Sequence, residues 1–331
     1  MTPPPDSSAH LLVTGASGCV GGAVCLAARA RGWRVTGLVR EGSEIDWLAA
    51  AEVATLPLQL DTPGLCPRLP AGLTHVVHCA ARIQAASDAD HYQLHVEGLR
   101  QLLQGLPPAL TRVLLITSLA PLAGRDRTEA LEPVSPATPG GPLQTLAAAE
   151  QLLQEWSRAS GVASTILRPG LVYGPRERWF LPGLLQRLKR GEFRFVGSGE
   201  QLLAHTASGN LAHATLLALE HPIAAGRVYH VTDEPALTQR DFIERVAQRA
   251  GLPIPRQAVP RRWAELAARP WWWRRANPAF PNPLLLELRW LGWNLPVSLE
   301  QCRRDLGYQP LLSTTAALDA ALAWYRERNV L

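Results

Sequence analysis

Several features are missing from this sequence, and each absence excludes a class of protein. No apolar stretch approaches the roughly 18 residues that a membrane-spanning helix requires. The N-terminal segment lacks a positive region followed by an apolar run, so we expect no secretory signal peptide. The five cysteines form no CxxC pair and no His/Cys cluster, which argues against a zinc site or a disulfide framework. We therefore expect a soluble protein of the reducing cytoplasm, with no bound metal.

Charge is sparse and nearly balanced along the chain. Only 18% of the 331 residues are charged, and 33 basic against 28 acidic side chains leave a net charge of +5. No basic block stands out, so we expect no nucleic-acid partner. Hydrophobic residues make up 47% of the chain, which supports a sizeable core and excludes a disordered polymer. At roughly 150 residues per domain, the length predicts two domains or one large α/β domain with a smaller lobe.

Short apolar runs alternate with helical patterns over the first half of the chain. Such alternation is typical of a parallel sheet, because parallel strands need crossover helices. The pattern predicts strands at 10–14, 34–39, 56–60, 75–79, 112–117 and 163–167, and helices at 18–31, 88–106 and 145–160. We predict a doubly wound α/β Rossmann domain over 10–170, preceded by a flexible tail at 1–9. Residues 171–331 would complete the sheet and form a small C-terminal substrate-binding lobe.

A glycine-rich loop joins the first predicted strand to the first predicted helix. It fits the pattern TGxxGxxG and consists of Thr14, Gly15, Ala16, Ser17, Gly18, Cys19, Val20 and Gly21. The first glycine allows the tight turn, the second lets the backbone approach a pyrophosphate, and the third lets the helix pack on the strand. The helix N-terminus adds N–H donors and a positive dipole, so the loop predicts a dinucleotide-binding site.

The residue that follows the second strand decides which dinucleotide fits. NAD sites place Asp or Glu there, roughly 20 residues after the glycines, to bind the ribose hydroxyls. This chain has Arg40, whose guanidinium can pair with the 2′-phosphate of NADP(H). We therefore expect NADP(H) in preference to NAD(H). The adjacent Glu41 is the argument for NAD(H), if it turns inward while Arg40 faces solvent.

Further segments carry a family resemblance. They are Asp61 after the third strand, His78-Cys79-Ala80-Ala81 after the fourth, Thr117-Ser118 after the fifth, the run LRPGLVYGP at 167–175 (with Pro169, Gly170 and Tyr173), GNLA at 209–212 and LGYQP at 306–310. Together with the glycine loop they resemble the extended short-chain dehydrogenase/reductases, in the branch of 3β-hydroxysteroid dehydrogenases, dihydroflavonol reductases and NAD-dependent epimerases. The resemblance covers nearly the whole chain. It implies cofactor contacts at Asp61, Cys79, Ala80, Ala81, Pro169 and Gly170, a catalytic Ser118, and a homodimer.

The catalytic centre departs from the family pattern. The family uses Ser together with a YxxxK pair, in which Tyr transfers the proton and Lys lowers the Tyr pKa from its ordinary value near 10. Thr145 and Glu150 fix the frame of the helix, and the Tyr and Lys positions then fall on Pro142 and Leu146. No nearby Tyr or Lys can take their place.

Three side chains are candidates for catalysis in the absence of the family's Tyr and Lys. Ser118 remains to bind the substrate oxygen, but a serine hydroxyl is a poor acid or base unless another group activates it. His95 stands where the family usually has Asn, and an imidazole titrates near 6.5, a useful range for acid–base catalysis. Tyr173 belongs to a segment that is often close to substrate in the family. The alternatives are a His95 packed on a buried helix face and a Tyr173 with a purely structural role.

A tryptophan-rich segment marks the later part of the chain. Six of the 11 tryptophans fall between Trp263 and Trp293, including Trp271–Trp273, with arginines at 261, 262, 274 and 275. These rings can line an apolar, aromatic substrate pocket. They can instead make a peripheral contact with a membrane surface or a second subunit.

Three functions remain open. The first is an oxidoreductase that uses NADP(H) on an alcohol or ketone of a small apolar organic substrate, with Ser118 binding the oxygen and His95, Tyr173 or water supplying the proton. The second is a lyase, isomerase or cyclase that keeps the pocket without net redox chemistry. The third is a non-catalytic NADP(H)-binding protein. Fold alone does not decide among them, and the first is our leading interpretation.

Overall fold

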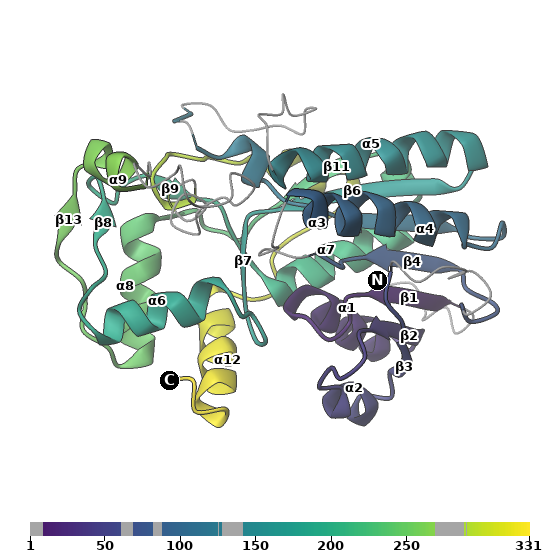
Figure 1. Ribbon diagram of the computed structural model, residues 1–331, viewed down its shortest axis with the longest axis horizontal. Helices are drawn as coiled ribbons and strands as arrows, with labels where there is room; N and C mark the ends of the chain where they lie inside the picture. The colour runs from purple at the N-terminus through teal and green to yellow at the C-terminus, as the bar shows by residue number, and fades with distance from the viewer. Residues whose placement is uncertain are drawn as a thin grey trace.

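A parallel sheet of seven strands lies between two layers of helices in the right-hand part of the molecule in Figure 1. The computed structural model describes residues 9–60, 69–81, 88–124, 126–127, 142–268, 288 and 290–331. The strands of this sheet are β1 (His10–Thr14), β2 (Arg34–Val39), β3 (Ala54–Pro57), β4 (His75–His78), β5 (Arg112–Ile116), β6 (Ala163–Pro169) and β11 (Val228–Val231). Their order is β11-β6-β5-β4-β1-β2-β3, and every neighbouring pair is parallel. This confirms the predicted doubly wound α/β fold.

Helices cover both faces of the sheet. One face carries α1 (Cys19–Ala30), α2 (Asp46–Ala50), α7 (Ser208–Glu220) and α11 (Glu300–Leu306). The other carries α3 (Asp88–Tyr92), the π-helical turn η2 (Gln93–Glu97), α4 (Gly98–Gln104) and α5 (Pro142–Ser160). Leu11 and Val13 of β1 pack under the first group and Leu12 under the second, following the two-residue alternation of a strand. The sheet is therefore buried on both sides.

Most predicted elements lie within two or three residues of the observed ones, and the differences have local causes. The third strand spans Ala54–Pro57 rather than 56–60, because it pairs with the end of β2 at Thr36–Val39. The helix predicted over 88–106 is interrupted by the π-helical turn η2. The helix predicted from 145 begins at Pro142, since proline suits the first position of a helix.

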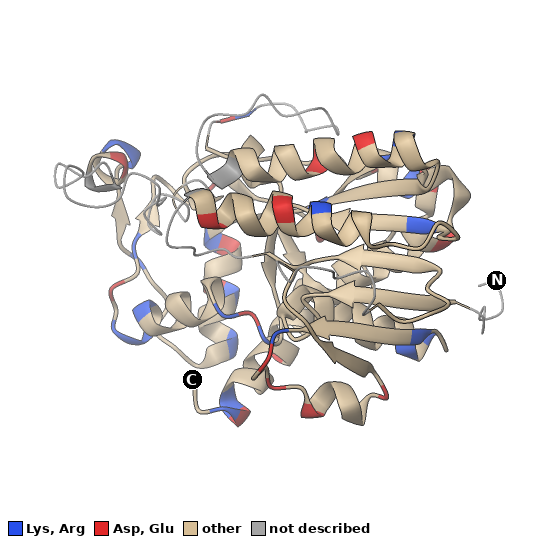
Figure 2. Cartoon of the chain, turned by 45° about the vertical axis from the view of Figure 1, so that its right-hand side comes forward, with Lys and Arg blue, Asp and Glu red and all other residues tan. Residues whose placement is uncertain are grey.

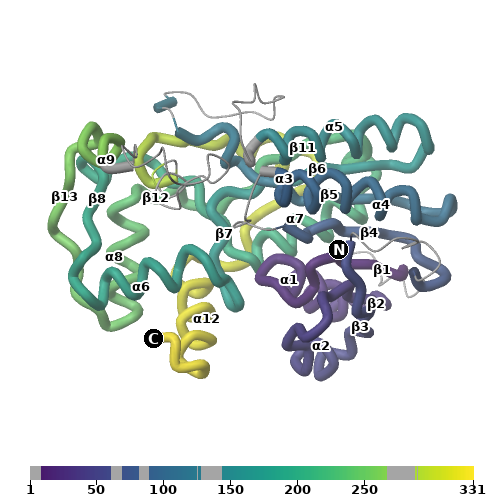
Figure 3. Tube along the Cα trace, in the orientation of Figure 1, coloured from purple at the N-terminus to yellow at the C-terminus, as the bar shows by residue number. Residues whose placement is uncertain are grey.

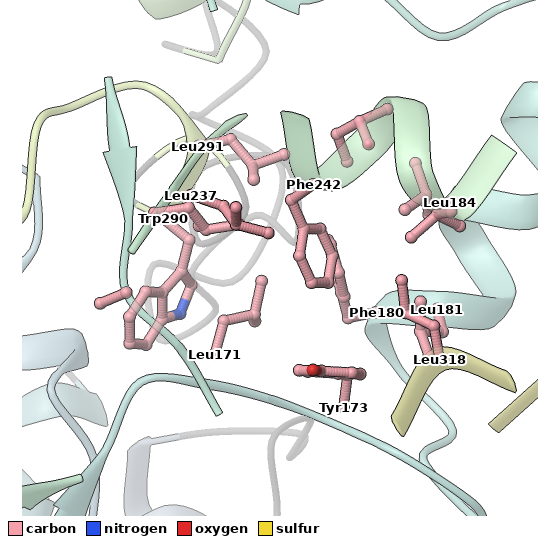
Figure 4. Packing of buried hydrophobic residues seen from close by; sticks show 14 of the residues in the cluster. Leu171, Tyr173, Phe180, Leu181, Leu184, Leu237, Phe242, Trp290, Leu291 and Leu318 are labelled. Carbon is pink, nitrogen blue, oxygen red and sulfur yellow. The ribbon is translucent and has the colours of Figure 1, made fainter. Parts of the chain in front are cut away.

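A second apolar core lies beside the sheet, whereas the 3₁₀ turn η4 (Pro222–Ala224) packs with α7 and α11 on the sheet itself. The elements around this second core are the 3₁₀ turn η3 (Ala120–Leu122) after β5 and, after β6, β7 (Leu171–Tyr173), α6 (Phe180–Lys189), β8 (Phe195–Val196), β9 (Leu202–Leu203), β10 (His205–Ala207), β12 (Leu237–Thr238), α8 (Gln239–Ala250), β13 (Ala258–Val259), α9 (Arg261–Ala268) and α12 (Thr314–Glu327). Phe180, Phe242 and Leu318 meet in the centre of this lobe (Figure 4). We call this part of the chain the lobe.

Few charged residues lie on the strands of the central sheet (Figure 2). Within the described ranges, no helix is both long and apolar enough to cross a bilayer. Several sequence predictions concern positions outside the described residues: residues 1–8 of the tail predicted at 1–9, Asp61, Trp271–Trp273 and the arginines at 274 and 275. The last residue of that predicted tail, Ala9, is buried in the core of the sheet instead.

Candidate functional site

The glycine loop lies at the carboxyl edge of the sheet, between β1 and α1. Gly15 takes a left-handed conformation (φ +67°), and a Cβ atom there would lie 3.1 Å from the Ala80 backbone. A Cβ atom on Gly21 would lie 2.4 Å from the Gly15 carbonyl oxygen, too close for any side chain. Gly18 precedes the helix in an extended conformation, and the first N–H groups of a helix have no acceptor within it. The loop is therefore a backbone cradle suited to a phosphate.

Thr14 joins this loop to the end of β4. Its Oγ1 accepts the backbone N–H groups of Cys79 and Ala80, each at 3.1 Å, and lies 3.0 Å from His78 Nδ1. Because both lone pairs of Thr14 Oγ1 are used, its hydroxyl donates to His78, whose own proton then sits on Nε2. Burial, with a smaller contribution from His95, lowers the His78 pKa to about 3. His78 is therefore a neutral structural imidazole behind the loop.

The loop between β2 and α2 lies against the other flank of the glycine loop. Ser17 Oγ donates to Ser43 Oγ at 3.4 Å, and the Ala16 N–H donates to the Leu38 carbonyl at 3.3 Å. Arg40 follows β2 here with an exposed side chain, and it forms no ion pair with any residue that the structure describes. Glu41 is exposed as well. The Arg40 guanidinium is thus available to an anionic ligand.

The two cysteines predicted to contact the cofactor have unreactive thiols. Burial raises the pKa of the Cys19 thiol to about 12 and raises that of Cys79 well above its ordinary value. Because the thiolate is the nucleophile, neither side chain is activated for covalent chemistry. Val20 packs on the core beneath the sheet, and Ala81 is exposed at the end of the described segment.

Ser118 lies after β5, beside the segment that follows β6. The Leu119 N–H donates to the Pro169 carbonyl at 2.9 Å and joins the two segments. Ser118 Oγ accepts the Ala120 N–H at 3.0 Å, so its own O–H can donate to a ligand oxygen. Gly170 has no room for a side chain, since a Cβ atom would lie 2.4 Å from a carbonyl oxygen of the lobe.

The helix that carries Tyr and Lys in the family is α5 in this chain. Pro142 is its first residue, and Leu146 follows one turn later, half-buried. Thr145 Oγ1 lies 2.9 Å from His95 Nδ1, and both side chains are buried. His95 comes from the π-helical turn η2, a conformation that is frequent at functional sites. An imidazole therefore reaches α5 one residue before the position of the missing Lys.

A buried ion pair fixes α5 to the sheet edge. Glu150 Oε1 accepts from Arg168 Nε at 2.9 Å, and Oε2 accepts from Arg168 Nη2 at 2.5 Å. Thr117, next to Ser118, donates its hydroxyl to Glu150 Oε1 at 2.6 Å. The side chains therefore join the ends of β5 and β6 to the helix that carries Thr145.

Tyr173 packs in the lobe core, and it lines a cavity together with Cys19 of the glycine loop. Its ring is fully buried in the lobe, 5.3 Å from the Phe242 ring between centroids, and its hydroxyl donates to Asp233 Oδ2 at 2.7 Å (Figure 4). Burial and the Asp233 charge raise the Tyr173 pKa far above its usual range. Asp233 also accepts from the Ala207 N–H and from Asn210. These contacts match the structural alternative for Tyr173.

The predicted residues thus separate into two groups. The glycine loop, the end of β4, Ser118 and the Pro169–Gly170 segment meet along one edge of the sheet, with His95 behind them. Tyr173 belongs to the lobe core and borders this edge only at the cavity that it shares with Cys19. Sequence reasoning missed the buried roles of His78 and Arg168. The available signal was a polar residue at the end of an apolar strand, where a buried position requires a partner.

Comparisons with known proteins agree with this geometry. Residues 11–232 match the NAD dependent epimerase/dehydratase family. The 4-hydroxy-2-methyl-3-oxo-4-farnesyl-3,4-dihydroquinoline-1-oxide ketoreductase of Stigmatella aurantiaca is 28% identical over 93% of this chain and 94% of its own length. A 3-beta-hydroxysteroid dehydrogenase of Mycolicibacterium neoaurum is 25% identical over 96% of this chain and 92% of its own. The crystal structure of gox2253 is similar, with TM-score 0.78 and 25% identity, over 97% of this chain and 99% of that one.

The family match spans well over half of the chain, from β1 to the end of β11, and the relatives are reductases and dehydrogenases aligned almost from end to end. The glycine cradle is the nucleotide-binding element that such proteins share. The chain belongs to the NAD dependent epimerase/dehydratase family, within the extended short-chain dehydrogenase/reductases.

Proposed function

We propose that this chain is an NADP(H)-dependent oxidoreductase that interconverts an alcohol and a ketone of a small apolar organic substrate. The contact between His95 and Thr145 carries the proposal, because it sets an imidazole beside the helix position of the missing Lys. In this proposal the Ser118 hydroxyl binds the substrate oxygen. His95 supplies or accepts the proton through the Thr145 hydroxyl. Tyr173 has no part, since its hydroxyl is bound to Asp233.

The glycine cradle supports the cofactor part of the proposal. Gly15, Gly18 and Gly21 place no Cβ atom between the loop and a pyrophosphate. The exposed guanidinium of Arg40 favours the 2′-phosphate of NADP(H). When bound, the nicotinamide supplies or accepts the hydride. Leu146 cannot hydrogen-bond the ribose as Lys does, so we expect weaker cofactor affinity than in a relative that has the full pair.

Two observations support an apolar substrate. The turn η3 directly after Ser118 is buried and apolar, with Leu119 and Leu122 in the lobe core. The relatives named above are a ketoreductase of a farnesylated quinoline oxide and a hydroxysteroid dehydrogenase. Both of these substrates join a large apolar body to a ketone or a secondary alcohol. We extend that class, and not either compound, to this chain.

Turnover of NADPH tests the proposal. Purified protein is mixed with NADPH and a panel of 3-oxosteroids and prenylated ketones, and the loss of NADPH absorbance is followed. We expect substrate-dependent consumption that falls by about 100- to 10,000-fold in His95→Gln, the usual contribution of a positioned proton donor. His95→Gln should also remove a dependence of rate on pH between about 5 and 8. Ser118→Ala should lower the rate through loss of the oxygen contact.

Matched variants control for side effects. Ser160 Oγ accepts the Val162 N–H at 3.3 Å, which repeats the contact of Ser118 Oγ with the N–H two residues later. Ser160 is exposed at the far end of α5. Ser160→Ala should therefore keep full activity. His221 is exposed, and His221→Gln should do the same. Product formed without change in NADPH would overturn the proposal in favour of an isomerase or lyase. Binding without any turnover would overturn it in favour of a non-catalytic protein.

A further inference from the structure

Arg176 sits in an unusual backbone conformation in the loop that follows β7. Its φ is +67°, a left-handed value that is unfavourable for a residue other than glycine. The next residue holds the loop in place. The Glu177 carboxylate accepts the N–H groups at the start of α6, from Trp179 at 2.5 Å, Phe180 at 2.9 Å and Leu181 at 2.7 Å. The surroundings therefore impose the Arg176 conformation, and such strain is often kept where a side chain must point to a ligand.

The Arg176 side chain extends from the lobe towards α1 and α2, where it stacks on Trp47. Its guanidinium carbon lies 3.5 Å from the centre of the Trp47 ring, on α2. Trp47 in turn packs on α1, where a Cβ atom on Gly22 would lie 2.5 Å from the indole. Arg176 also interacts electrostatically with Cys19, the first residue of α1. The guanidinium therefore lies over the first turn of α1, beside the glycine cradle.

No acidic group balances this charge. Within the described part of the chain Arg176 forms no ion pair, and its Nε is buried without a hydrogen-bond partner. Glu177 is close in sequence, but its carboxylate is occupied by the backbone of α6. Burial and then the nearby Arg328, which is itself paired with Glu327 at 3.7 Å, lower the Arg176 pKa. An anion bound to the Arg176 guanidinium would offset the cost of its burial.

Open space adjoins the guanidinium. A cavity of about 240 Å³ lies between α1, the loop after β7 and α12. Its lining is mostly apolar, and its polar side chains are those of Cys19, Tyr173, Arg176 and Ser208. The tube of Figure 3 shows the loop after β7 passing between α12 and α1. Arg176 thus borders open space at the junction of the lobe and the sheet, with its guanidinium stacked on the Trp47 ring.

We infer that Arg176 is a phosphate-binding residue of the dinucleotide site, contributed by the lobe and held in position by Trp47. A planar guanidinium matches the geometry of phosphate oxygens and can bind two of them at once. Stacking on an aromatic face fixes its orientation before the ligand arrives. This inference rests on the proposed function, and it adds a determinant of cofactor affinity that lies outside the glycine loop and outside the strand ends.

Titration calorimetry with NADPH, NADH and adenosine 2′,5′-bisphosphate tests the inference. Arg176→Gly is the informative variant, because glycine adopts φ +67° without strain and the loop should fold at least as well. Loss of a charge-assisted contact should raise Kd by about 10- to 100-fold. Arg178→Ala is the matched control: it removes a positive charge two residues away from an exposed side chain and should leave Kd unchanged. Trp47→Leu should weaken binding by a smaller factor.

The ligands distinguish the phosphate that is bound. An equal rise of Kd for NADPH and NADH in Arg176→Gly supports contact with the bridging pyrophosphate. A rise confined to NADPH and the bisphosphate supports contact with the 2′-phosphate. If Arg176→Gly binds every ligand with the same Kd as the control Arg178→Ala and the unsubstituted protein, the inference is overturned and the proposed function stays intact. A wild-type protein that binds no dinucleotide would overturn the proposed function itself, and this inference with it.

Discussion

Replacing Glu150 by Gln should destabilise the protein strongly. The carboxylate is 6% exposed and Arg168 is 3% exposed, so the pair lies almost entirely out of water. Glu150→Gln keeps the shape of the side chain but removes its charge. The buried Arg168 guanidinium then loses the Glu150 charge opposite it, and removing one partner of a buried ion pair costs about 3–5 kcal/mol. Against a total stability of about 5–15 kcal/mol, that loss is large.

Removing both charges of the Glu150–Arg168 pair should destabilise the protein less than removing the Glu150 charge alone. A buried ion pair replaced by apolar residues of similar volume is often neutral or more stable. The double variant Glu150→Leu/Arg168→Met should therefore be more stable than Glu150→Gln alone, although the Thr117 hydroxyl loses its acceptor. The sign of that difference separates the cost of losing the Glu150 charge from the cost of losing hydrogen bonds alone.

Urea denaturation followed by tryptophan fluorescence measures these changes as shifts of the transition midpoint. Glu155→Gln is the control on the same helix: Glu155 is exposed and accepts a hydrogen bond from Gln151 at 2.8 Å. It should change stability by less than about 0.5 kcal/mol. A loss below about 1 kcal/mol for Glu150→Gln, or a double variant less stable than the single one, would refute the reasoning.

Three further predictions follow from the same contacts. Gly21→Ala should abolish dinucleotide binding in calorimetry, because its Cβ would lie 2.4 Å from the Gly15 carbonyl oxygen. The His78 pKa is about 3 in the folded protein and near 6.5 when unfolded, so the unfolded chain binds more protons. Stability should then fall as pH drops from about 6.5 towards 3, by up to about 1.4 kcal/mol per pH unit, and less steeply in His78→Leu. Tyr173→Phe should cost about 1–3 kcal/mol through the loss of its bond to Asp233, without altering the pH profile of turnover; an altered profile would return Tyr173 to the active site.

The cofactor-binding half of the site could be predicted because it depends on backbone shape. A glycine at a fixed distance after an apolar strand is required wherever a turn has positive φ or a Cβ would collide, as at Gly15 and Gly21. The strand ends follow from the same alternation that predicts the sheet. The loss of Tyr and Lys was equally visible, since it needs only the frame set by Thr145 and Glu150.

The contacts that we propose for proton transfer could not be predicted, because they join segments that are distant in the sequence. Whether His95 reaches Thr145 depends on a π-helical turn, one extra residue in a helical turn, for which the sequence carries no clear signal. Tyr173 belongs to a segment that resembles the family, yet β7 buries residues 171 and 173 and so turns the ring into the lobe. Arg176 and Trp47 meet only after the lobe has packed on the sheet.

Transfer of deuterium tests the central claim most directly. NADPH deuterated at the transferable C4 position is incubated with the protein and each ketone of the panel, and the product alcohol is analysed by mass spectrometry. If the protein is an NADP(H)-dependent reductase, the product alcohol should carry deuterium at the carbinol carbon. The variants Ser118→Ala and His95→Gln should form this deuterated alcohol at a much lower rate. A product that lacks deuterium, or no conversion of any ketone by a protein that binds NADPH, would contradict the claim and leave the fold in use for other chemistry.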